Sequence, residues 1–63
     1  MVINTRGPEG NAFVIMNKVK GVLVALGKSN AEVDKVISEM MAGDYEHLKT
    51  VATEATNGLI EFE

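Results

Sequence analysis

The residues most able to do chemistry in this chain lie around its only histidine, His47. Asp44, three positions earlier, and the adjacent Glu46 could join it in a metal site or an acid–base pair. Carboxylates are also favoured in the first turn of a helix, where they interact with its positive end. Neither Thr5 nor Ser29 stands at a recognisable motif spacing from the histidine, so no nucleophilic constellation is visible. The sequence therefore predicts no catalytic residue, no metal site and no cofactor.

The second chemical candidate is the glycine-containing segment 6–11, which precedes the longest apolar stretch. Glycines let the backbone approach a ligand closely, and free N–H groups at a helix start attract phosphate or carboxylate. A small anionic ligand such as a nucleotide would be held by Arg6, Gly7, Gly10 and Asn11. Glu9 opposes this reading by its charge, and no phosphate-loop lysine motif is present. The alternative is a tight turn with a helix cap, in which Arg6 pairs with Glu9 or Glu61.

Apolar residues at helical spacing extend from residue 12 to residue 26 and exceed what one face can hold. Gly21 and Ala25 are small and four positions apart, so another helix can approach closely. We therefore expect a homo-oligomer, a dimer before larger assemblies, that associates through this helix. Its expected interface residues are Phe13, Val14, Gly21 and Val24. Alternatively, methionines could form a soft groove for a partner helix, although at this spacing they more often belong to the core; these are Met16, Met40 and Met41, with Phe13 beside them.

These residues must be positioned by three helices and two short terminal strands, in the order β-α-α-α-β. The pattern predicts a mainly helical α+β fold in a single domain, residues 1–63. The strands are expected at 1–5 and 59–63, paired with each other or with a second subunit. The first helix is expected over 12–26, capped by Asn11, unless a helix starts at Pro8 with Thr5 or Gly7 as its cap. The other two start at the caps Ser29 and Asp44 and end at Gly43 and at Asn57-Gly58.

Size and composition favour self-association and a reducing compartment. A 63-residue chain buries only about 60% of the surface its unfolded form exposes, and this one has no cysteine for a disulfide. The apolar stretch 12–26 is shorter than the ~20 residues that span a bilayer and contains Asn17, Lys18 and Lys20. The amino terminus lacks the pattern of a secretory signal. We expect a cytoplasmic protein that does not enter membranes.

Charge is distributed unevenly, with a net of +3 over residues 1–28 and −6 over residues 29–63. The two later helices with their short turn superficially resemble a helix-turn-helix. However, the helix that would enter the groove of DNA carries Asp44, Glu46 and Glu54 against Lys49 alone, so it would repel phosphates. Nucleic acid is therefore the least expected partner. The uneven charge could instead guide an anion or a second subunit.

Several segments of the chain together resemble a group of small proteins encoded by bacteriophages and prophages. These segments cover residues 3–13, 26–27, 38–40 and 43–46, and the most specific of them is Arg6-Gly7-Pro8-Glu9-Gly10-Asn11-Ala12-Phe13. The resemblance implies a phage-like genetic setting and hence the cytoplasm of a host cell. It carries over no catalytic residue and no mechanism.

The sequence thus favours a small non-enzymatic binding protein of phage type. We expect it to act by oligomer-supported protein–protein interaction, with a host or defence factor as the partner. Binding of a small anionic ligand at residues 6–11 is the alternative. Helix-turn-helix DNA binding is the second alternative.

Overall fold

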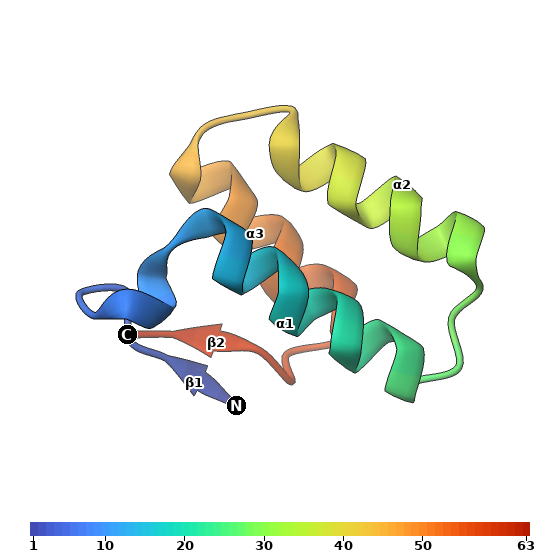
Figure 1. Cartoon of the computed structure of the whole chain (residues 1–63), viewed down its shortest axis with the longest axis horizontal. Coiled ribbons are helices and arrows are strands. Elements are labelled where there is room, and N and C mark those ends of the chain that lie inside the picture. The colour runs from blue at the N-terminus through green and yellow to red at the C-terminus, as the bar shows by residue number, and fades with distance from the viewer.

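The computed structural model describes all 63 residues and has the expected element order (Figure 1). Three helices stand between two short strands, and a 3-10 helix, η1, precedes the first long helix. The elements are β1 (Val2–Ile3), η1 (Pro8–Gly10), α1 (Ala12–Ala25), α2 (Asn30–Met41), α3 (Tyr45–Ala55) and β2 (Glu61–Phe62). The mainly helical α+β fold predicted from the sequence is therefore confirmed.

Each long helix begins at the residue predicted to cap it, because a side-chain oxygen there accepts a backbone N–H of the first turn. The bonds are Asn11 Oδ1 with the N–H of Phe13 (2.8 Å), Ser29 Oγ with that of Glu32 (3.2 Å) and Asp44 Oδ1 with that of His47 (2.9 Å). The reciprocal bond of a capping box, from the Glu32 side chain to Ser29, is not formed. Pro8 opens η1 with Gly7 as its cap, so the two predicted helix starts both exist, in series.

The helix ends also follow the sequence. Gly27 has a φ of +83° directly after α1, and Asn57 and Gly58 have φ values of +55° and +80° after α3. Glycine and asparagine tolerate this left-handed conformation better than other residues. Helix α2 ends at Met41, and Gly43, in the turn before α3, has no side chain that would collide with the ring of His47.

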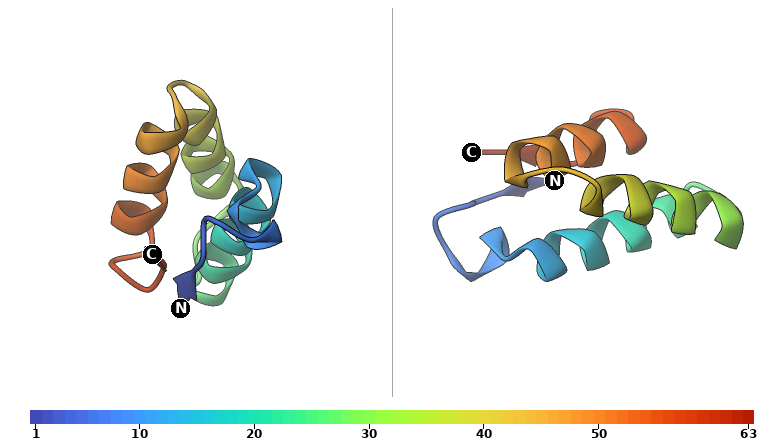
Figure 2. Two further views of the ribbon diagram at one scale, coloured as in Figure 1. Left: turned by 90° about the vertical axis from the view of Figure 1, so that its left-hand side faces the viewer. Right: turned by 90° about the horizontal axis from the view of Figure 1, so that it is seen from above.

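One hydrophobic core joins the three helices and both strands. Nine hydrophobic residues form it: Ile3, Ile15, Val19, Leu23, Val33, Met40, Leu48, Ala52 and Ile60. Figure 2 shows α1 and α3 on opposite sides of this core, with α2 across one end and the strands at the other. None of the helices combines the length and the apolar character that a membrane-spanning segment needs.

The two strands pair with each other within one chain, in parallel, with Val2 opposite Glu61 and Ile3 opposite Phe62. The N–H groups of Glu61 and Glu63 donate to the carbonyls of Met1 and Ile3 at 2.8 and 3.0 Å. Each strand is two residues long rather than the five expected. Turns cause the difference: Asn4 accepts the N–H of Arg6 at 2.9 Å and ends β1, while Leu59 donates to Thr56 at 3.0 Å and delays β2.

Candidate functional site

The groups around His47 serve to join two helices. Nε2 of His47 donates to the carbonyl oxygen of Glu39 near the end of α2, at 2.9 Å. A Cβ at Gly43 would lie 2.7 Å from the histidine ring, so the glycine makes room for it. Asp44 is engaged as the cap of α3. The structure has no group of three or more His, Asp or Glu side chains placed to hold a metal ion.

The backbone N–H groups of the loop before α1 bond within the loop itself. They donate to nearby carbonyls in three bonds: Gly7 to Asn4 (3.4 Å), Gly10 to Gly7 (3.0 Å) and Asn11 to Pro8 (3.3 Å). The N–H of Arg6 also has an internal partner, the Asn4 side chain. Only the backbone N–H of Glu9 has no partner in this loop, so few backbone donors are left for an anion.

Gly10 and Arg6 have different surroundings in that loop. A Cβ at Gly10 would collide with the carbonyl oxygen of Thr5, so the close approach of two backbone segments accounts for this glycine. Arg6 is exposed and lines a polar pocket of about 260 Å³ with Asn4 and Glu63. The expected pairing of Arg6 with Glu9 or Glu61 is wrong, because the only ion pair joins Lys49 to Glu46.

The side of α1 that faces away from the core carries exposed residues of the predicted interface. We call this surface the α1 outer face; it consists of Phe13, Asn17, Lys20, Gly21 and Val24, all exposed. Phe13 is 72% exposed and Val24 is 57% exposed. Phe13 and Val24 are eleven residues apart, so their side chains point within about 20° of the same direction. They lie some 16 Å apart along the helix axis. Val14 differs from the other predicted interface residues in being half-buried.

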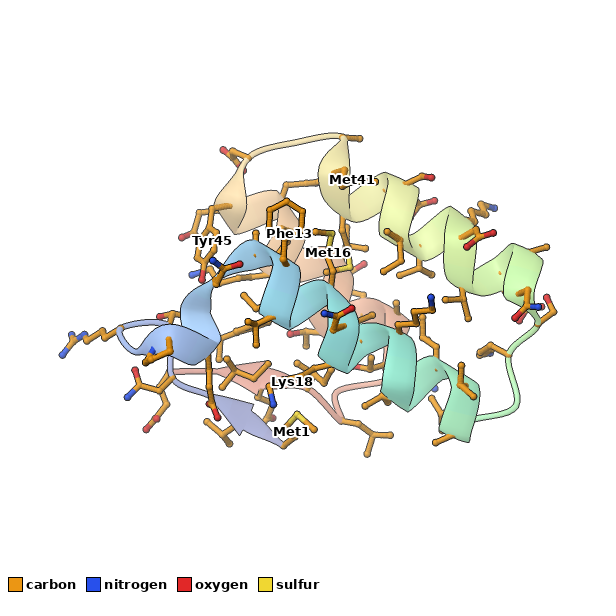
Figure 3. All side chains as sticks on the ribbon, viewed as in Figure 1. Met1, Phe13, Met16, Lys18, Met41 and Tyr45 are labelled. Carbon is orange, nitrogen blue, oxygen red and sulfur yellow. The ribbon has the colours of Figure 1, made fainter.

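Phe13 lies at the end of the molecule where α1 begins, α2 ends and α3 begins (Figure 3). In this view the labelled side chains of Met16, Met41 and Tyr45 are seen in the same region. Met41 is 61% exposed, whereas Met16 packs partly against the core and Met40 is a core residue. The expected methionine groove is thus only partly realised. The Tyr45 hydroxyl donates to the carbonyl oxygen of Gly10 at 2.6 Å, which ties α3 to the loop that leads into α1.

A second surface, which the sequence did not predict, is an open groove of about 670 Å³ between α3 and the strands. We call it the α3–sheet groove. The lining residues most relevant to binding are Val2, Glu46, Thr53, Glu54, Glu61 and Phe62. Val2 is 54% exposed although it belongs to a strand. Together with Phe62 it adds apolar surface to a groove that also has carboxylates in its lining.

The groove has an excess of negative charge. The ammonium group of Lys49, also in its wall, is 3.0 Å from a carboxylate oxygen of Glu46 and 5.4 Å from the centre of the Tyr45 ring. Glu54 and Glu61 have no ion-pair partner. Two carboxylates are therefore left for a ligand of opposite charge.

The position of β2 beside α3 depends on Thr56, the only buried polar residue. Its hydroxyl donates to the carbonyl of Ala52 at 2.7 Å and accepts the N–H of Ile60 at 3.2 Å. These bonds link the C-terminal end of α3 to Ile60, the residue directly before β2. The sequence carries only a weak sign of this role, a threonine at the end of a helical pattern.

Comparison with known proteins assigns no family to the chain. No protein-family model matches it, and no curated protein and no solved structure is significantly similar to it. The phage-like setting drawn from residues 6–13 stays a prediction. Function must therefore be inferred from the α1 outer face and the α3–sheet groove.

Proposed function

We propose that this protein is a small, non-enzymatic binding domain that forms a homodimer through the α1 outer face and binds a partner protein with its remaining surface. The phage resemblance makes a host-cell protein in the cytoplasm the expected partner. The exposure of Phe13 supports the proposal most directly, because 72% of this aromatic side chain is exposed on a 63-residue protein. Exposed apolar surface marks an interaction site when several side chains share it, and the exposed Val24 lies on the same side of α1 as Phe13.

An antiparallel pair of α1 helices fits the α1 outer face. A two-fold axis between residues 18 and 19 would place Phe13 of each copy on Val24 of the other, since both lie on one side of the helix. Gly21 has no side chain, and a Cβ there would meet no atom within 4 Å, so the surface is open for close approach. The same register places Lys20 opposite Asn17, whose amide oxygen can accept from the ammonium group.

The area required is within reach of so small a chain. A stable interface buries about 800 Å² on each partner, roughly a fifth of the 4016 Å² that this protein exposes. Burial of an aromatic side chain contributes about 1.5–3 kcal/mol, and the dimer would bury Phe13 twice. The two lysines near the axis oppose association modestly, because water and salt screen exposed charges.

The two other functions considered from the sequence gain no support. In the loop over residues 6–11 every backbone N–H donor except that of Glu9 is engaged, so we expect no nucleotide to raise the melting temperature. A nucleotide-dependent shift that Arg6→Ala abolishes would restore the anion-binding alternative. A helix that reads DNA needs positive charge on its exposed side. The exposed side of α3 carries Glu46 and Glu54, so we expect it to repel the phosphates of DNA.

The dimer is best tested by disulfide trapping between two different single-cysteine variants. The chain has no cysteine of its own, so Phe13→Cys and Val24→Cys each introduce a unique thiol. An antiparallel dimer brings residue 13 of one copy onto residue 24 of the other. Two copies of residue 13 would lie about 16 Å apart along the axis, far beyond the ~7 Å limit between Cα atoms for a disulfide.

We expect oxidation of the mixed variants to give a covalent heterodimer and oxidation of each variant alone to give none. The mixture keeps one native contact between Phe13 and Val24, so the interface is not lost. Crosslinking of Phe13→Cys with itself would indicate a parallel pair instead. No crosslink in any sample, together with a monomeric parent protein at 100 µM, would reject the dimer.

A further inference from the structure

We propose that the α3–sheet groove binds a basic, extended segment of the partner protein, which adds as a third strand to the free edge of β2. This inference rests on the proposed role in protein binding, because it names the chemistry of the partner. It uses a different surface from the dimer, so the two can fail separately.

The free edge of β2 follows from the pairing of the strands. Glu61 and Glu63 direct their N–H groups to β1. Successive residues of a strand direct their backbone polar groups to opposite edges, so the N–H and carbonyl of Phe62 face away from β1. Phe62 has no backbone hydrogen bond outside the strand pair. An unpaired strand edge of this kind is a template for another strand.

The groove lies at that edge and has room for a peptide. Its volume of about 670 Å³ falls within the ~300–1,000 Å³ typical of ligand sites. An added strand would lie about 4.8 Å from β2, beneath the side of α3 that carries Thr53. Val2 pairs with Glu61 and Ile3 with Phe62, so the side chains of Val2 and Glu61 share one face of the sheet and that of Phe62 lies on the other. Phe62 therefore offers an apolar contact to every second side chain of the peptide, as in other cases of strand addition.

Charge selects the kind of segment. Glu54 and Glu61 lack ion-pair partners, and the single lysine of the groove is already paired. A segment in which lysine or arginine alternates with apolar residues would place its positive charges at these carboxylates and its apolar side chains at Phe62. A second copy pairing through its own β2 is disfavoured, because Glu61 and Glu63 of both copies would then lie side by side.

Titration with a designed peptide tests the proposal. The probe is a fluorescein-labelled hexapeptide that alternates valine with lysine, and binding to the parent protein is followed by fluorescence anisotropy. A second peptide has the same side chains but methylated backbone nitrogens, so it keeps the charge and cannot donate to β2. In parallel, the backbone amide of Phe62 is followed by NMR, because pairing with a new strand shifts it and slows its hydrogen exchange.

Two protein variants with the same change of charge serve as a matched pair. Glu54→Lys with Glu61→Lys alters the groove, whereas Glu32→Lys with Asp34→Lys places the same charges on α2. We expect the groove variant to bind the probe roughly 10-fold more weakly and the α2 variant to bind within about 2-fold of the parent. N-methylation should weaken binding at least as much, by ~10-fold.

The proposal is overturned if the probe does not bind at 1 mM, if the methylated peptide binds equally well, or if the α2 variant loses as much affinity as the groove variant. Dimerisation is measured on the same samples by sedimentation. Loss of peptide binding with an intact dimer rejects the groove alone. A dimer lost in the groove variant indicates instead that the α1 outer face docks into the groove of another copy.

Discussion

The α1 outer face and the α3–sheet groove belong to opposite sides of the core and differ in shape and in charge. The first is a convex helix surface with a highly exposed phenylalanine, and it carries Lys20 but no acid. The second is concave, has an unpaired strand edge and is rich in carboxylates. A convex helix surface on which Phe13 can pack against Val24 of a second copy suits a symmetric dimer. An unpaired strand edge suits the binding of an extended peptide segment.

The two surfaces also depend on different supports. The bond from Tyr45 to Gly10 holds the chain just before α1, close to Phe13. The two bonds of Thr56 hold β2 beside α3. Each surface can therefore be disturbed by a substitution that leaves the other in place, which makes the comparison open to experiment.

The largest expected effect is that of Phe13→Glu on the dimer. Two phenylalanines leave the interface and two charges enter it, so association should weaken by about 3 kcal/mol or more, roughly 100-fold. Sedimentation equilibrium measures this. Leu59→Glu, an equivalent change at an exposed residue outside α1, should leave the dimer intact. Equal losses in both variants would remove the distinction between the α1 outer face and the rest of the surface.

Thr56→Val should act mainly on the groove. Valine preserves the shape but leaves the N–H of Ile60 without its acceptor, so the free energy of unfolding should fall by about 1–3 kcal/mol. Chemical denaturation measures the loss. Thr50→Val, whose hydroxyl is exposed and bonds one helical turn back, is the control for stability alone, because Thr50 also lines the groove. The folded variant should bind the groove peptide more weakly and dimerise normally. Unchanged stability would show that Thr56 does not fix β2.

Added salt should change the affinities of the two surfaces in opposite directions. Raising NaCl from 0.05 to 0.5 M shortens the screening length, so peptide binding to the carboxylates of the groove should weaken by roughly 5- to 10-fold. Dimerisation should stay the same or tighten slightly, because the lysines near its axis repel each other less. Parallel titrations at both salt concentrations give the answer. A dimer that weakens with salt as much as the peptide complex would mean that charge attraction holds both.

Tyr45→Phe should have the smallest effect. It removes the 2.6 Å hydrogen bond to Gly10 and keeps the ring, so unfolding should become easier by about 0.5–1.5 kcal/mol. Thermal unfolding measures this loss. Because the bond positions the start of α1, dimerisation should weaken by a few-fold while groove binding is unchanged. The reverse pattern would place Tyr45 in support of the groove.

The sequence predicts what is local in this fold and misses what depends on contacts between distant segments. Asn11, Ser29 and Asp44 cap their helices as expected, because a cap depends on its own first turn. The parallel pairing of residues 59 positions apart, the free edge of Phe62 and the burial of Thr56 have no local sign. Arg6 shows the same limit: its partner could not be inferred, and neither expected acid pairs with it.

The most direct test of two separate surfaces is the mass of the complex between the parent protein and the hexapeptide, measured by sedimentation equilibrium at 100 µM protein. If the α1 outer face joins the copies and the groove takes the peptide, the main species contains two chains and two peptides. A complex of one chain with one peptide, formed as the dimer disappears, would contradict this, because it would mean that the peptide and the second copy compete for one surface.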